Sequence, residues 1–229
     1  MNLRGAGLGF GLARKTYNAG ATEDVRKVIE AVSHRAKGSR IALIGFSLGA
    51  NLALKLASEV ATNPLANLDC VIAANPPLDL MACSRQMRRL ENRLYDRNFV
   101  KILTKQIQRL HEFFPDLGPT GLDGVRTLLE FDMAYTAPRH GFRDVEDYYE
   151  QSSAGPRLGK ITTPTLIVHA LDDPFIPAES FKNLTIPPSL ALELESFGGH
   201  LGYLSRRMKN HDRRWLDARL AAWLTARWE

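Results

Sequence analysis

The chain has 229 residues, 45% of them hydrophobic and 24% charged, and it carries a formal net charge of +5. This length and composition predict one domain with a sizeable apolar core. No apolar run approaches the roughly 20 residues that a membrane-spanning helix requires, which argues against a span.

The beginning of the chain shows neither the apolar stretch nor the cleavage site of a signal peptide. The two cysteines, Cys70 and Cys83, are interpreted as reduced thiols, so we expect a cytoplasmic protein. No Cys/His cluster has metal-ligand spacing, and the glycines near the N-terminus do not match the dinucleotide-binding fingerprint. We therefore expect no metal and no organic cofactor.

The first predicted helix begins at Thr22, where Glu23 and Asp24 suit a helix N-terminus, and it ends near residues 37–39. A short apolar strand is predicted at residues 41–44. The helix carries apolar residues at helical spacing, namely Val25, Val28, Ile29 and Val32.

The rest of the sheet is predicted from further apolar runs. A helix at 50 to about 60 precedes a strand at 70–74, and strands follow at 165–170 and 191–195. Continuously apolar strands are typical of parallel strands covered on both faces, whereas the last strand alternates leucine with glutamate, as a strand with one polar face or a strand at an edge does. A final helix has its apolar side at Trp215, Leu216, Leu220, Trp223 and Leu224. The pattern predicts an α/β fold with a mostly parallel sheet flanked by helices.

Residues from about 76 to 160 have helical patterns and no comparable strand. We interpret them as a lid inserted within a single domain that spans residues 1–229. Within this lid, residues 85–109 hold eight arginines and lysines against two acids. A solvated helix face is the simpler explanation, and peripheral contact with an anionic membrane is the functional one. No nucleic-acid-binding motif accompanies the charge, so we expect no nucleic-acid partner.

A candidate nucleophile lies directly after the first strand, in Gly45-Phe46-Ser47-Leu48-Gly49. A strand, a sharp glycine-flanked turn and a helix form the setting of a nucleophile elbow, which lifts a serine hydroxyl to where a base can reach it. The Leu48 amide, at the start of the helix, is the candidate oxyanion donor. The alternative is an ordinary turn with a capping serine.

Six histidines are candidates for the base: His34, His111, His140, His169, His200 and His211. His200 stands out because it follows two glycines in the loop that leaves the last strand. A loop histidine bonded to the local backbone is the alternative. His169 lies inside an apolar run, where a core histidine is the simpler interpretation.

The candidate acid is Asp173, which leaves the strand at 165–170 and stands four residues before Pro177. We expect it to orient His200, with Asp172 forming the turn or supporting the site from behind. Asp79, after the strand at 70–74, is the second candidate for the acid.

Several motifs together resemble the YheT-like α/β-hydrolases, along nearly the whole chain. They are Asn2–Gly5, Tyr17–Asp24, Gly45–Asn51, Phe131-Asp132, Ala137–Phe142, Tyr148-Tyr149, Ser152, His169–Phe175 and Gly198–Gly202. The resemblance implies a serine hydrolase that cleaves carboxylic esters of small molecules or lipids, with Ser47, Asp173 and His200 as its catalytic triad. The chain order Ser, Asp, His is the α/β-hydrolase order. A thioesterase or an acyltransferase would use the same triad.

The resemblance also has a departure. In the family, the motif found here at Asn2–Gly5 follows the fourth strand, so we expect this chain to lack the preceding strands and the loop that gives the second oxyanion amide. A partial α/β-hydrolase fold of this kind would leave one sheet edge open to self-association. It also keeps a second interpretation open, a catalytically impaired module that binds a partner through that edge.

Overall fold

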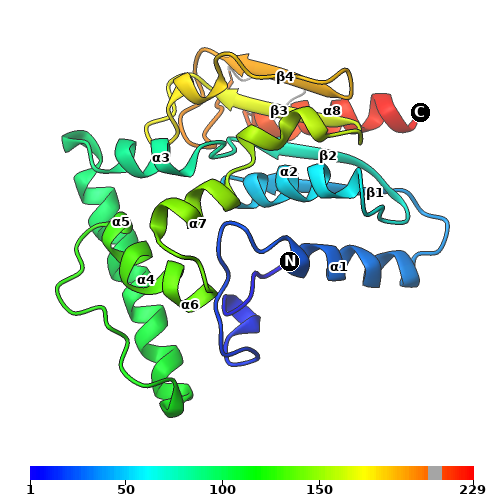
Figure 1. Ribbon diagram of the computed structural model, residues 1–229. Helices are drawn as coiled ribbons and strands as arrows, with labels where there is room; N and C mark the ends of the chain where they lie inside the picture. The colour runs from blue at the N-terminus through cyan, green and yellow to red at the C-terminus, as the bar shows by residue number, and fades with distance from the viewer. Residues whose placement is uncertain (206–212) are drawn as a thin grey trace.

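The computed structural model describes residues 1–205 and 213–229. A four-stranded parallel sheet is its centre, with strands in the order β1 (Ile41–Phe46), β2 (Leu68–Ala74), β3 (Thr165–Ala170) and β4 (Leu190–Glu195). Helices α1 (Thr22–Arg35), α2 (Leu48–Val60) and α8 (Trp215–Trp228) accompany it (Figure 1). The predicted fold class, a mostly parallel sheet flanked by helices, is confirmed.

The two faces of the sheet bury alternate residues of the central strands. On β2, Val71 and Ala73 pack into the core with α2, whereas Ile72 packs into the core with Leu216 and Leu220 of α8. This alternation follows from the two-residue period of a strand. Helices cover both faces at β2 and β3, so these strands are continuously apolar.

Strand β1 departs from this pattern. Its residues Ile44 and Phe46 are 39% and 46% exposed. They lie on the face of the sheet that α8 covers at β2 and β3. The expectation that β1 is covered on both faces is therefore wrong for the described part of the chain. Strand β4 lies at the other edge of the sheet, which is one of the two alternatives that its alternating leucines and glutamates offered.

Helix α1 also buries less than its pattern predicts. Val25 and Ile29 pack against Leu52 and Leu56 of α2, but Val28 and Val32, the other half of the predicted stripe, are exposed. Helix α1 packs on α2, which itself lies on the sheet, so only a narrow strip of α1 is buried.

The segment between β2 and β3 is helical, as predicted. It contains α3 (Leu80–Met87), α4 (Arg93–Phe113), α5 (Leu128–Phe131), α6 (Ala137–His140) and α7 (Val145–Ser152). Figure 1 shows α4, α5 and α6 to one side of the sheet, with the N-terminal segment next to α6. Its role as a lid, and the division of the chain into one domain with an insertion, stay predictions.

The N-terminal segment before α1 is tied to this helical segment. The Asn18 side-chain amide bonds to His140 at 2.9 Å, the Ala19 amide donates to the Tyr148 hydroxyl at 3.0 Å, and Gln106 donates to the Gly5 carbonyl at 2.8 Å. Asn18 and Ala19 therefore lie beside α6 and α7, and Gly5 lies beside α4. Among the described residues, no helix is both long and apolar enough to cross a bilayer.

Candidate active site

Ser47 occupies the turn between β1 and α2, with φ of 51° and ψ of −122°. A positive φ is uncommon for a residue with a side chain and costs on the order of 1–3 kcal/mol. A Cβ at Gly45 would collide with the Gly49 carbonyl, so the strand can approach the helix only through a glycine. A Cβ at Gly49 would meet no described atom, so only the first of the two predicted glycines is required sterically.

Three predicted residues form one hydrogen-bonded chain. Ser47 Oγ lies 3.0 Å from His200 Nε2, and His200 Nδ1 lies 2.8 Å from Asp173 Oδ2. An ionised carboxylate only accepts hydrogen bonds, so Nδ1 carries the ring proton and Nε2 accepts from the serine hydroxyl. The three residues follow β1, β3 and β4, and the carboxyl ends of these parallel strands meet at one edge of the sheet.

The Asp173 carboxylate is fully enclosed and has four donors. Its Oδ1 accepts from the amides of Phe175 and Ile176 at 2.8 and 3.1 Å, and its Oδ2 accepts from Asn75 at 2.6 Å as well as from His200. Burial raises the pKa of Asp173, but these bonds and the His200 ring outweigh it and hold the pKa below its ordinary value. The carboxyl is therefore ionised at neutral pH.

The other two candidate acids serve the backbone instead of the ring. Asp172 Oδ1 accepts from the amides of Gly198 and Gly199 at 2.8 and 2.7 Å, which fixes the loop that presents His200. Asp79 caps α3 through the Ala82 amide at 2.9 Å. Of the three candidates, only Asp173 reaches the His200 ring.

The remaining described histidines lie elsewhere. His169 is fully buried and stacks on Phe181 with ring centroids 3.9 Å apart, and burial lowers its pKa to about 4. His111 bonds to Tyr135, His140 bonds to Asn18, and His34 lies exposed in the last turn of α1. His211 lies outside the described residues.

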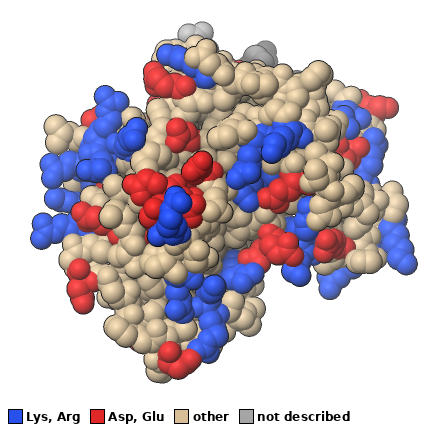
Figure 2. Space-filling model, in the orientation of Figure 1, with Lys and Arg blue, Asp and Glu red and all other residues tan. Residues whose placement is uncertain are grey.

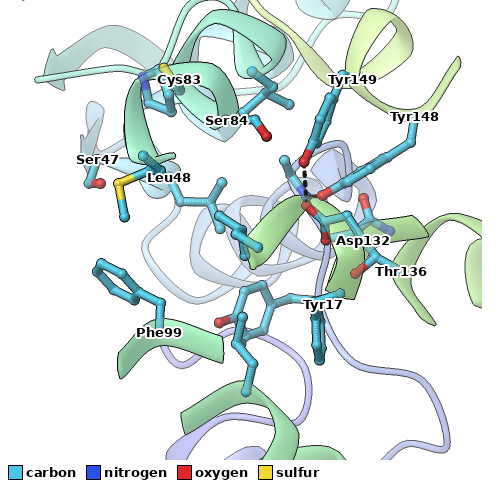
Figure 3. Close-up of a pocket in the computed structure, with 18 of the residues that line it drawn as sticks. Tyr17, Ser47, Leu48, Cys83, Ser84, Phe99, Asp132, Thr136, Tyr148 and Tyr149 are labelled. Atoms are coloured by element: carbon cyan, nitrogen blue, oxygen red, sulfur yellow. Dashed lines mark hydrogen bonds between the residues drawn. The ribbon is translucent and has the colours of Figure 1, made fainter. Parts of the chain in front are cut away.

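Leu48 is the first residue of α2, so its amide belongs to the unpaired donors of a helix N-terminus. No backbone hydrogen bond from this amide to another described residue is present. Leu48 and Ser47 both line the same cavity, as Figure 3 shows. The amide and the positive end of the helix dipole are thus placed beside the serine.

The cavity has a volume of about 340 Å³. It lies between the sheet edge and the helices α3 and α4, and Ser47 and His200 both line it. Much of its wall is apolar, including Leu80, Met87, Phe99, Leu103, Ile107 and Phe175. Such a space suits a hydrocarbon chain next to the serine.

Sequence reasoning missed Asn75 as a residue of the site. It is fully buried, with φ of 47°, and its amide donates to Asp173 and to the Gly199 carbonyl at 3.2 Å, while its oxygen accepts from Tyr203 at 2.6 Å. Its place directly after an apolar strand was the available signal, because polar residues at that position reach the same sheet edge. The two prolines that follow it indicated only the end of a strand.

Comparison with known proteins places the chain in a family. Residues 1–206 match the alpha/beta hydrolase fold family, and the chain belongs to it. It is 34% identical to the Escherichia coli (strain K12) protein YheT, which its name describes as an esterase, over 98% of this chain and 66% of that protein. The predicted resemblance to YheT-like proteins is confirmed.

More distant relatives are also matched over part of their length. The chain is 29% identical to the monoacylglycerol lipase of Saccharomyces cerevisiae over 91% of this chain and 47% of that protein. It is 28% identical to the mouse phospholipase ABHD3 over 84% of this chain and 47% of that protein. The chain therefore spans about half to two-thirds of these curated relatives.

Solved structures support the fold alone. An α/β fold family hydrolase from Bacillus anthracis str. Sterne superposes with a TM-score of 0.51 at 16% identity, over 87% of this chain and 74% of that one. The Pyrococcus furiosus esterase Pf2001 superposes with a TM-score of 0.50 at 17% identity, over 90% and 60% of the two chains.

Proposed function

We propose that the chain is a serine hydrolase that cleaves carboxylic esters of small molecules or lipids through an acyl-enzyme. The observation that carries the proposal is the hydrogen-bonded chain from Ser47 through His200 to Asp173, opening onto an apolar cavity. The esterase and lipase names of the relatives agree with it.

In the first half-reaction, His200 Nε2 takes the Ser47 proton while the serine oxygen attacks the ester carbonyl. Asp173 fixes the ring tautomer and stabilises the imidazolium that forms. The Leu48 amide and the N-terminus of α2 stabilise the negative oxygen of the tetrahedral intermediate. His200 then gives the proton to the leaving alcohol, and the acyl group stays on Ser47.

In the second half-reaction, His200 removes a proton from water, which attacks the acyl-enzyme and regenerates Ser47. Protein groups and water carry every step of this scheme. A thiol leaving group would make the same site a thioesterase, and an alcohol in place of water would make it an acyltransferase. The apolar cavity suits an acyl chain in all three reactions, and the esterase and lipase names of the relatives are what favour the ester hydrolase.

A fluorophosphonate probe tests this proposal. We expect it to label Ser47 in the folded chain and to leave Ser47→Ala unlabelled, because only an activated serine reacts readily. Intact-mass analysis with peptide mapping locates the adduct, and circular dichroism confirms that both proteins are folded. Label on another residue would contradict the assigned nucleophile, and no label in folded wild type would favour the non-catalytic binding module.

A further inference from the structure

The cavity has two chemically different sides. Figure 3 shows Ser47 and Phe99 on one side, and Asp132, Thr136, Tyr148 and Tyr149 on the other. The first side is mainly apolar apart from the serine. The second side places a carboxylate and several hydroxyl groups in the wall of a cavity that otherwise suits hydrocarbon.

Asp132 begins the π-helical turn Asp132–Thr136 and is 8% exposed. Its Oδ2 accepts from the Tyr149 hydroxyl at 2.8 Å, and the Thr136 hydroxyl is its other side-chain donor. A carboxylate can accept about four hydrogen bonds, so these two leave it able to accept more. Single π-helical turns are frequent at functional sites, which agrees with a role for this one.

The Ser84 hydroxyl lies in the cavity wall on the same side as Tyr149 (Figure 3). Ser84 Oγ is buried and makes no well-formed hydrogen bond to a described residue, and the Tyr149 hydroxyl lies beside it. A buried hydroxyl without a well-formed hydrogen bond is costly, so a group bound in the cavity is a natural partner. The Tyr17 hydroxyl also lines the cavity, but Figure 3 shows it turned away from Asp132, toward Phe99.

We propose that Asp132 and Ser84 bind a hydroxyl group that the substrate carries across an apolar stretch from its ester. This inference rests on the proposed hydrolase function, because that function places the ester at Ser47. A hydroxyl donates to Asp132 and accepts from Ser84 at the same time. An ammonium group can only donate, and an alkyl end would make a hydrogen bond to neither residue.

Binding to Ser47→Ala tests the inference without any turnover. Isothermal titration compares methyl ω-hydroxyalkanoates with the matching methyl alkanoates over a series of chain lengths. At the chain length that spans the cavity, we expect the hydroxy ester to bind about tenfold more tightly, the effect of one additional hydrogen bond to a charged group.

Ser84→Ala, made in the Ser47→Ala background, is the decisive variant. Since Ser84 Oγ makes no well-formed hydrogen bond in the described protein, its removal should change the melting temperature little. The preference for the hydroxy ester should fall at least threefold, and Asp132→Asn should reduce it further. Glu112→Gln, at an exposed position on α4, is the control that keeps it.

The inference is wrong if hydroxy and plain esters bind equally at every length, if ω-amino esters bind best, or if Ser84→Ala keeps the full preference. A lack of measurable binding by any ester would overturn it too. These outcomes are independent of the fluorophosphonate result, because ester binding to Ser47→Ala does not depend on the reactivity of Ser47. Labelling at Ser47 without a hydroxy preference would leave the hydrolase proposal intact and remove only this inference.

Discussion

At the residue scale, the neighbouring acids Asp172 and Asp173 hold different parts of one assembly. Asp173 contacts the His200 ring, while Asp172 accepts hydrogen bonds from the two backbone amides just before His200. Neighbouring residues therefore have separate roles, because Asp173 orients the His200 ring and Asp172 anchors the loop that carries it. Both acids follow the same strand, but two adjacent carboxylates cannot both be directed at the same ring, so only one of them can orient His200.

Replacement of these two acids should have unequal effects. Asp173→Asn should lower kcat/KM for an ester by a factor on the order of 10⁴, because an amide at this position favours the wrong imidazole tautomer. Asp172→Asn keeps an oxygen that can accept from both glycine amides, so we expect a loss of about tenfold or less. Steady-state kinetics on p-nitrophenyl esters measures both, and equal losses would contradict the assignment of Asp173.

Asp132 gives a pH-dependent prediction. Burial raises its pKa to about 6, so the folded state binds this proton more tightly than the unfolded state. Its contribution to the free energy of unfolding is full below about pH 4 and is lost as the pH rises through 6. Asp132→Asn lacks this loss, so its stability relative to wild type should rise by roughly 2 kcal/mol between pH 4 and pH 7.

Urea unfolding of both proteins at several pH values measures this difference. The contributions of other titratable groups to the free energy of unfolding cancel between wild type and variant, because these groups titrate in both proteins. Stability curves that run parallel across this range would show that Asp132 has an ordinary pKa in the folded protein.

The residues that sequence reasoning found and missed differ in how their roles arise. Ser47 follows from a local pattern of strand, glycine turn and helix, and His200 and Asp173 follow from loops that leave apolar strands. Asn75 has the same position relative to β2, but its role depends on the distance to Asp173, which no local pattern contains. Ser84 was missed because a serine on an amphipathic helix gives no sign that it faces a cavity.

At the element scale, helix α4 combines exposed basic and apolar side chains. Arg93, Arg97 and Lys101 are exposed, and so are Leu94 and Ile102, at 78% and 54%. Figure 2 shows Lys and Arg side chains gathered on the side of the molecule where α4 begins in Figure 1. We propose that this helix makes peripheral contact with anionic membranes, since both the charge and the apolar residues suit a lipid interface.

Vesicle co-sedimentation tests the role of α4. Arg93→Glu with Arg97→Glu should abolish binding to phosphatidylserine vesicles at low salt, because each basic residue contributes about 1 kcal/mol near such a surface. The matched reversal on α1 and its C-terminal loop, Arg35→Glu with Lys37→Glu, should leave binding intact. Added salt should weaken binding by the wild type. Equal binding to anionic and neutral vesicles would leave the basic residues as a solvated face.

The sheet and its flanking helices followed from sequence more closely than the inserted helices did. The first three strands have continuous apolar runs, and the predicted limits of all four strands differ from the observed ones by at most two residues. Between residues 76 and 160, helical character was evident, but the break into α3–α7 depends on how short helices pack on one another. The π-helical turn at Asp132–Thr136 has no local signature in the sequence.

At the scale of the whole molecule, the two edges of the sheet are unlike. Strand β4 carries Glu193 and Glu195, and Glu193 pairs with Arg219. Strand β1 pairs only with β2 among the described residues, and it presents Ile44 and Phe46 beside its open edge. Charged residues protect an edge, while an apolar edge invites pairing. We propose that β1 is a site of self-association for this chain.

Light scattering after size-exclusion chromatography tests this proposal. We expect the 229-residue chain to form dimers or larger species, and Ile44→Lys to shift it toward the monomer, because a charge on this face disfavours contact between copies. Val32→Lys, which changes an exposed apolar residue on α1, is the matched control. A monomeric wild type at all concentrations would contradict the role of β1.

The bond between Ser47 and His200 joins residues that are 153 positions apart in the chain. During synthesis at about 5–20 residues per second, the serine emerges on the order of ten seconds before its base does. Throughout that interval the Ser47 hydroxyl lacks the His200 ring that would take its proton. In the hydrolase that we propose, Ser47 therefore becomes reactive only after β4 has docked, and the onset of that reactivity reports that folding is complete.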